Sequence, residues 1–184
     1  MKTFKMNYLI LAILFSVTSG LNAKIIYVDG FANNGGDGSS WDKAFTTITE
    51  GLNAASSGDE VWVASDIYTG QYIMKPGVSV YGGFIATETS LNQRDYIKNR
   101  TILKNNTGLV LKNQSGLTED AYFDGFDIRD ARTTSGNGGG GYLSPKMHLR
   151  NCRILNCTSE VGTGGGISLE AGASVENCIF AGNS

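Results

Sequence analysis

The hydrophobic positions in the C-terminal third of this chain repeat every 26 residues. The segment RNCRIL, which starts at Arg150, returns as ENCIFA from Glu176, and a step of 26 residues backwards reaches DGFDIR from Asp124. The aligned copies place apolar side chains in three columns: Phe123, Leu149 and Val175; Phe126, Cys152 and Cys178; and Ile128, Ile154 and Phe180. The last two columns lie two residues apart, which is the spacing of a strand. A repeat of this length is typical of one coil in a stacked solenoid, with these columns facing inward.

Turn-forming residues separate the apolar segments. Glycine runs occupy residues 138–141 and 164–166, and the whole chain has 25 Gly but only 2 Pro. Short runs of Val, Ile and aromatic residues at 25–28, 60–64, 67–68, 72–74 and 78–84 predict further strands. The chain is therefore expected to be mostly β.

One short helix is predicted at residues 48–55. Thr47 and Glu50 form a capping box, Ile48 and Leu52 fall on one face, and Gly58 supplies the stop. Such a helix would cover the first coil, whose backbone edge is otherwise unpaired.

Residues 1–23 have the pattern of a secretory signal peptide. Lys2 and Lys5 precede an apolar stretch at residues 8–17, and Ala23 is a small residue suited to cleavage. A membrane anchor is the alternative, but the stretch is shorter than the roughly 20 residues that a spanning helix needs. Cleavage would leave 13 basic and 17 acidic residues, a net charge of −4. That charge argues against nucleic acid and anionic membranes as partners.

The remaining chain is expected to form one domain. Residues 24–70 would supply an N-terminal strand, a loop and the capping helix, and residues 71–184 would form the coils. The sequence stops at Asn183 and Ser184, immediately after the third copy of the repeat, without a polar or helical cap. Because the terminal units of solenoids need a cap, we expect a truncated fragment of a longer protein or capping by self-association.

Several segments carry a resemblance to a known family. They are YVDGFANNGGDGSSWDKAF, SSGDEVWVASDIY, VSVYGGFIATETSLNQRD, RTIL, GGGI and NCIFAGNS. The chain resembles right-handed single-stranded parallel β-helix proteins of the pectin-lyase-like superfamily, in particular secreted or surface forms from Bacteroidetes. GGGI at 164–167 and FAGN at 180–183 are also similar to motifs of chlamydial polymorphic outer membrane proteins. The resemblance implies an all-β fold and a secreted, cell-surface or outer-membrane location, but no activity, because this superfamily hosts lyases, hydrolases, tailspikes and adhesins.

The outward columns do not predict a catalytic centre. In lyases of this fold, carboxylates of neighbouring coils hold calcium while Arg or Lys removes a proton. Here one column holds Asp124, Arg150 and Glu176, and the other holds Asp127, Arg153 and Ile179. Alternating charge favours a structural ladder, since opposite charges on neighbouring strands stabilise by about 0.2–1 kcal/mol.

A calcium loop and a thiol site are weaker possibilities. Asp29, Asn33, Asn34 and Asp37 could suggest calcium, but they lack the regular alternation and closing Glu of a calcium loop, so a turn-rich loop is favoured. No cofactor is therefore assigned. Cys152 and Cys178 occupy one inward column and are expected to be buried thiols, although a disulfide stays open in an exported protein. Zinc is disfavoured, because His148 is the only histidine.

The candidate binding residues are the charged group Asp127, Arg129, Asp130 and Arg132, which leads into a glycine-rich segment. A loop that leaves a solenoid often carries binding function, and a solvated turn is the alternative. Four tyrosines could stack on sugars or fill the interior: Tyr81, Tyr96, Tyr122 and Tyr142. Periodicity does not decide which face each one takes.

The sequence thus favours an exported scaffold for adhesion or glycan binding, with a glycan or another cell-surface component as the partner. The alternative is a polysaccharide lyase or glycoside hydrolase that acts on acidic polysaccharide with catalytic coils beyond Ser184.

The structural ladder can be tested at Arg150. The substitution Arg150→Glu would place three acids in one column, and like charges on neighbouring strands repel. We expect a lower melting temperature, measured by circular dichroism. An unchanged melting temperature would rule out the ladder.

Overall fold

The computed structural model describes residues 23–33, 36–112, 116–134 and 136–184. The expected signal peptide, residues 1–23, lies outside the described residues except for Ala23. The described chain is all-β with few helices, and its strands pair in parallel.

Three sheets and one short strand pair contain the strands. Sheet A is built from β1 (Ile25–Val28), β2 (Glu60–Ala64), β5 (Ser79–Phe84), β8 (Ala121–Asp124), β12 (Met147–Arg150) and β16 (Ser174–Glu176). Sheet B is built from β3 (Ile67–Thr69), β6 (Thr101–Lys104), β9 (Phe126–Arg129), β13 (Arg153–Leu155) and β17 (Ile179–Ala181). Sheet C is built from β4 (Tyr72–Ile73), β7 (Leu111–Lys112), β11 (Gly141–Leu143) and β15 (Ile167–Leu169). The pair is β10 (Arg132–Thr133) with β14 (Thr158–Ser159).

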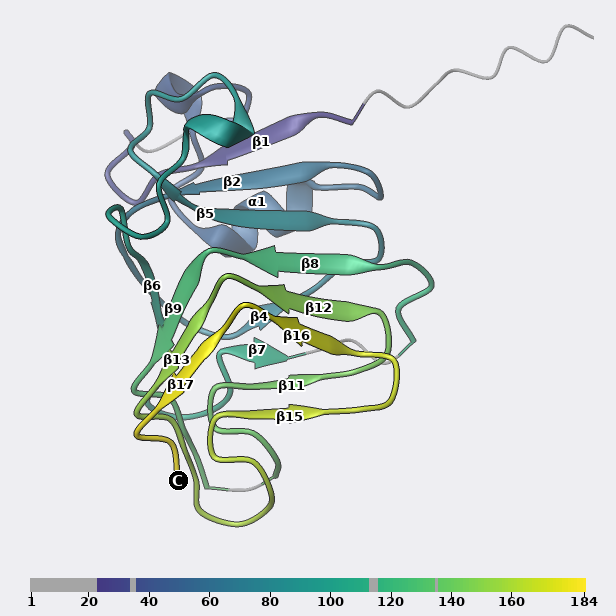
Figure 1. The fold of residues 1–184 in the computed structure, drawn as a ribbon. Coiled ribbons are helices and arrows are strands. Elements are labelled where there is room, and N and C mark those ends of the chain that lie inside the picture. The colour runs from purple at the N-terminus through teal and green to yellow at the C-terminus, as the bar shows by residue number, and fades with distance from the viewer. Residues whose placement is uncertain (1–22, 34–35, 113–115, 135) are drawn as a thin grey trace, which may run out of the picture.

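The chain visits the sheets in a fixed order. From β8 it passes through β9 in sheet B, β10 in the short pair and β11 in sheet C, and it returns to sheet A at β12 (Figure 1). The next pass runs through β13, β14 and β15 to β16. Phe123 pairs with Leu149, and Leu149 pairs with Val175, so one pass takes 26 residues. The register predicted from the sequence is therefore confirmed.

The inward columns form the core between the sheets. Phe123, Leu149, Ile128 and Ile154 are completely buried. The rings of Phe123 and Phe126 lie 4.1 Å apart between centroids. Burying each large apolar side chain stabilises the fold by about 1.5–3 kcal/mol.

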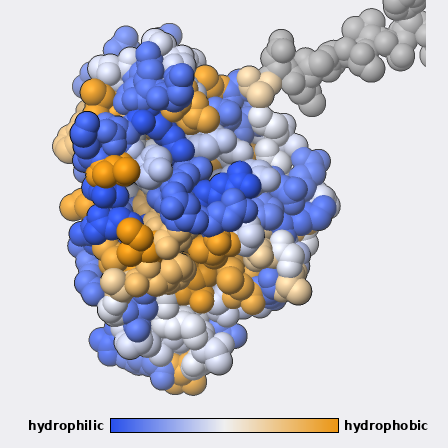
Figure 2. Space-filling model, in the orientation of Figure 1, coloured by the Kyte–Doolittle hydropathy of each residue, from blue (hydrophilic) through white to orange (hydrophobic). Residues whose placement is uncertain are grey.

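The last strands leave part of this apolar core exposed. β15, β16 and β17 are the outermost strands of their sheets, and the inward residue Phe180 is 47 % exposed. Figure 2 shows apolar surface over the region where these strands lie in Figure 1. Cover of this edge by a continuation of the chain or by a second copy stays a prediction.

The predicted helix is α1 (Ile48–Ala54), which ends one residue before the predicted boundary. The hydroxyl of Thr47 accepts a hydrogen bond from the Glu50 amide (3.2 Å), and the Glu50 carboxylate accepts one from the Thr47 amide (3.1 Å), so the capping box is confirmed. Ile48 and Leu52 are buried in the core. A Cβ at Gly51 would lie 2.6 Å from Val28 Cγ2, so the glycine permits close packing of α1 on β1.

The corner between sheets A and B contains one residue in the left-handed backbone region. It is Gly125 (φ 84°) after β8, Asn151 (φ 53°) after β12 and Asn177 (φ 50°) after β16. Glycine and asparagine are the residues that most readily adopt this conformation. Each pass therefore turns sharply from sheet A into sheet B at this residue.

The corner at Gly125 is also tightly packed, which gives a test with a matched control. A Cβ there would lie 2.7 Å from Arg94 Nη1 and 2.9 Å from Tyr96 Cβ, whereas one at Gly58 (φ 90°) would meet nothing within 4 Å. Both Gly→Ala variants carry the cost of a positive φ. We expect Gly125→Ala to lower the free energy of unfolding by about 1–3 kcal/mol more than Gly58→Ala, because of the overpacking.

Urea unfolding of both variants measures this difference. Equal losses would show that the corner tolerates a side chain and that only its backbone conformation matters.

Candidate functional site

The four charged residues predicted from the sequence do not form one exposed loop. Asp127 and Arg129 lie on β9, Asp130 occupies a left-handed turn (φ 56°), and Arg132 lies on β10. The Asp127 side chain is only 1 % exposed, so it does not sit in a solvated turn. Arg129 Nη2 lies 2.5 Å from Asp127 Oδ2, so the structure brings these two residues together.

The other two candidates have separate partners. Lys104 Nζ lies 2.9 Å from Asp130 Oδ2 and, by its hydrogen bond, holds the pKa of that carboxyl below its usual range. Arg132 pairs with Glu160 on the surface. Asp130 and Arg132 therefore have ion-pair partners that differ from those of Asp127.

Two further arginines contact Asp127. Arg153 Nη1 lies 3.5 Å from Oδ2, and Arg100 Nη1 lies 3.4 Å from Oδ1. Arg153 belongs to the outward column found in the sequence. Arg100 precedes β6 outside the 26-residue repeat, so no periodic signal marked it.

A concave surface feature lies beside sheet C. It is a groove of about 560 Å³, which we call the tyrosine groove. Its polar and apolar lining includes Lys112, Leu117, Asn137, Tyr142, Ser144 and Glu170. Pockets for small ligands commonly have volumes of about 300–1,000 Å³.

The groove brings an aromatic ring and several polar groups together. The Tyr142 hydroxyl donates a hydrogen bond to Glu170 Oε1, which raises the pKa of Tyr142. Lys112 on β7 is the register partner of Tyr142 on β11. The Ser144 hydroxyl is buried and has no hydrogen-bond partner among the described residues. The groove therefore offers donors, an acceptor and a ring face.

Sequence reasoning named Tyr142 but missed Glu170. The register partner of Tyr142 is Ser168, and Glu170 lies two positions further along the chain. Diagonal neighbours two residues apart share a face of a sheet. Extending the 26-residue alignment to this strand would thus have placed Glu170 near Tyr142.

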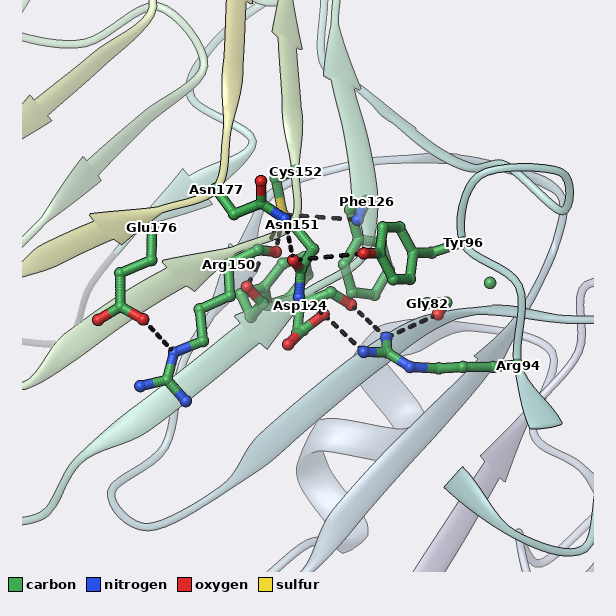
Figure 3. A network of polar contacts seen from close by, with 12 residues as sticks. Gly82, Arg94, Tyr96, Asp124, Phe126, Arg150, Asn151, Cys152, Glu176 and Asn177 are labelled. Carbon is green, nitrogen blue, oxygen red and sulfur yellow. Dashed lines mark hydrogen bonds and ion pairs between the residues drawn. The ribbon is translucent and has the colours of Figure 1, made fainter. Parts of the chain in front are cut away.

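In the column of Asp124, Arg150 and Glu176, only one of the two expected ion pairs forms among the described residues. Arg150 Nε lies 3.0 Å from Glu176 Oε2, as a structural ladder requires (Figure 3). Asp124 is paired instead with Arg94, whose Nη2 lies 2.6 Å from Asp124 Oδ1. Arg94 also donates to the backbone carbonyls of Gly82 (3.0 Å) and Asp124 (3.1 Å). This arginine fastens the loop between β5 and β6 to sheet A.

The three cysteines are free thiols, and two of them interact. Cys152 is buried, and burial raises the pKa of its thiol. Its backbone amide donates to Cys178 Sγ (3.3 Å), and its thiol donates to the backbone carbonyl of Arg150 (3.0 Å). The neighbouring Cys152 thiol is the main cause that lowers the pKa of the half-buried Cys178 to about 7, and the hydrogen bond from the Cys152 amide also lowers it.

The loop considered for calcium uses its carboxylates for turns. Asp29 accepts from the Phe31 amide (3.0 Å), and Asp37 accepts from the Ser39 amide (3.0 Å). Asn34 lies outside the described residues. Within the described part of the chain, no three His, Cys, Asp or Glu side chains are grouped to hold a metal ion.

No described helix is long and apolar enough to cross a membrane. Comparisons of the chain with models of protein families, with curated proteins and with solved structures found no match.

The Cys152–Cys178 contact predicts uneven thiol reactivity. The thiolate is the reactive form, so iodoacetamide should modify Cys178 before the buried Cys157, with a rate that rises through about pH 7. Removing the neighbouring thiol in Cys152→Ala should raise the pKa of Cys178 towards its ordinary value of 9.0 and move this profile to higher pH.

Mass spectrometry of the labelled peptides follows the reaction, and Cys157→Ala is the control. A Cys178 profile that is the same in Cys152→Ala would contradict an effect of the Cys152 thiol on the pKa of Cys178.

Proposed function

We propose that this chain is an exported right-handed parallel β-helix of the pectin-lyase-like type, and that it acts as a scaffold which binds glycans in the tyrosine groove. Export is supported by the signal-like pattern of residues 1–23.

The β-helix proposal is supported by the order of the strands. The chain returns to sheet A after each visit to sheets B and C, and successive visits pair in parallel. Connections between parallel strands of one sheet are almost always right-handed. The quoted motifs add a resemblance to this superfamily.

The proposal of glycan binding depends on the juxtaposition of Tyr142 and Glu170. A tyrosine ring presents an apolar face to the C–H groups of a sugar, and a carboxylate accepts hydrogen bonds from its hydroxyls. Asn137 and Lys112 add donors in the same groove. The charges of Lys112 and Glu170 balance, which favours a neutral glycan.

The groove is better suited to binding than to hydrolysis. Glycoside hydrolysis generally uses two carboxylates that flank the scissile bond. Glu170 is the one carboxylate among the described residues that line the groove. The Tyr142 hydroxyl already occupies one oxygen of that carboxylate.

An array of neutral glycans, followed by calorimetry with the best ligand, tests this proposal. We expect Tyr142→Ala to weaken binding at least tenfold, which is about 1.4 kcal/mol, because the ring face is lost. Ile67→Ala is the control, since Ile67 is an exposed side chain (56 %) on sheet B outside the groove.

Equal binding by Tyr142→Ala and the unaltered chain would exclude the tyrosine groove as the site. If the chain binds no glycan on the array, neutral glycan binding is excluded.

A further inference from the structure

A second concave site lies beside the carboxyl ends of β1 and β5. It is a pocket of about 380 Å³, which we call the aromatic corner. Its lining comes from three segments, namely Tyr27 on β1, residues 40–42 and residues 86–89. It shares no lining residue with the tyrosine groove, so the two sites are separate.

Two aromatic rings bound this pocket. Tyr27 points away from the core, because Ile26 and Val28 on either side of it are buried. Trp41 lies in a short 3₁₀ helix, η1 (Trp41–Lys43), and is half-buried. The centroids of the Tyr27 and Trp41 rings lie 4.7 Å apart, and the ring planes meet at 66°. Two rings at such an angle enclose a corner and present the negative faces of their π systems to a ligand that lies in it.

Hydrogen bonds hold Trp41 and the loop after β5 in place. The indole Nε1 of Trp41 donates to the backbone carbonyl of Glu88 (2.8 Å). The Glu88 carboxylate in turn accepts from the amides of Ile85 (2.9 Å) and Thr87 (3.0 Å). Trp41 also packs against Phe84, with the ring centroids 5.6 Å apart. The aromatic corner is therefore ordered before a ligand arrives, which reduces the entropy lost on binding.

The aromatic corner is also negatively charged. Asp42 and Glu88 line it, whereas no described Lys, Arg or His does. Glu88 is 7 % exposed, and its carboxylate is bonded to backbone amides without an ion-pair partner among the described residues. Asp42 is exposed and makes neither a hydrogen bond nor an ion pair within the described part of the chain. The field in the corner therefore favours a cation and opposes an anion.

We propose that the aromatic corner binds a quaternary ammonium group, such as the trimethylammonium of choline. A cation over an aromatic face is attracted by the ring quadrupole, and tryptophan gives the strongest attraction. The methyl groups of a trimethylammonium pack on the rings of Tyr27 and Trp41, and the nitrogen has no N–H group that needs an acceptor. A primary ammonium would bring three N–H donors, for which the ring faces offer no lone pairs.

Titration of the chain with choline, followed by NMR of the indole N–H signals, tests the site. The chain has two tryptophans, and Trp62 is only 2 % exposed, so its signal should shift less than that of Trp41. We expect binding to be about tenfold weaker for 3,3-dimethylbutan-1-ol, which has the shape of choline without its charge. Ethanolamine, which keeps the charge but lacks the methyl groups, should also bind about tenfold more weakly.

Two variants separate the contribution of the ring from that of the charge. Trp41→Leu removes the ring face and should weaken choline binding about tenfold in calorimetry. Asp42→Asn removes one negative charge without breaking a contact and should weaken binding about threefold, as expected for an exposed ion pair. Glu119→Gln is the matched control, because it removes one negative charge from an exposed side chain before β8, at the opposite end of the sheet A strands.

The proposal is overturned if the Trp41 signal does not shift, if 3,3-dimethylbutan-1-ol or ethanolamine binds as tightly as choline, or if Glu119→Gln weakens binding as much as Asp42→Asn does. If Trp41→Leu does not fold, the two analogues and Asp42→Asn still decide.

Titration with phosphocholine and with vesicles of phosphatidylcholine then identifies the source of the group. Binding of either one upholds the site, and the tighter one distinguishes a soluble head group from a lipid. The result does not depend on the tyrosine groove, because Tyr142→Ala should bind choline as tightly as the unaltered chain does.

Discussion

The corner between sheets A and B, where one residue has a positive φ, is the constraint on which the repeated part of the structure depends. At this corner the backbone has a positive φ, at Gly125, Asn151 and Asn177 in three successive passes. Because the corner has the same length in each pass, the strands on both sides keep a common register of 26 residues. The two asparagines then use their side chains to continue the hydrogen bonding along the stack. Backbone conformation, register and amide orientation are thus linked at one position.

The periodic part of the fold could be predicted from the sequence because strand pleating separates inward from outward residues. Phe123, Leu149 and Ile154 are buried where the alignment put them. The capping box of α1 could also be predicted, since its two hydrogen bonds are made within four consecutive residues. In both cases the information is local or repeats at a constant spacing.

The candidate sites could be predicted only in part, because their residues come from segments that do not repeat. Asp127 occupies an outward position, yet it is buried beneath arginines that include Arg100 from outside the repeat. Arg94 likewise reaches Asp124 from a loop that has no counterpart in later passes. Contacts of this kind depend on the path of a long loop in three dimensions, which periodicity does not encode.

The number of residues between paired positions in sheet A varies along the chain, but the pairing of the strands does not change. Val80 on β5 pairs with Phe123 on β8, a separation of 43 residues, while Phe123 and Leu149 are 26 residues apart. The additional residues leave the pairing of sheet A undisturbed. Each doubling of loop length costs only about 0.6 kcal/mol in closure entropy, so the outer loops can lengthen at small cost. The fold can therefore acquire new surface by insertion at its connections while its interior remains the same.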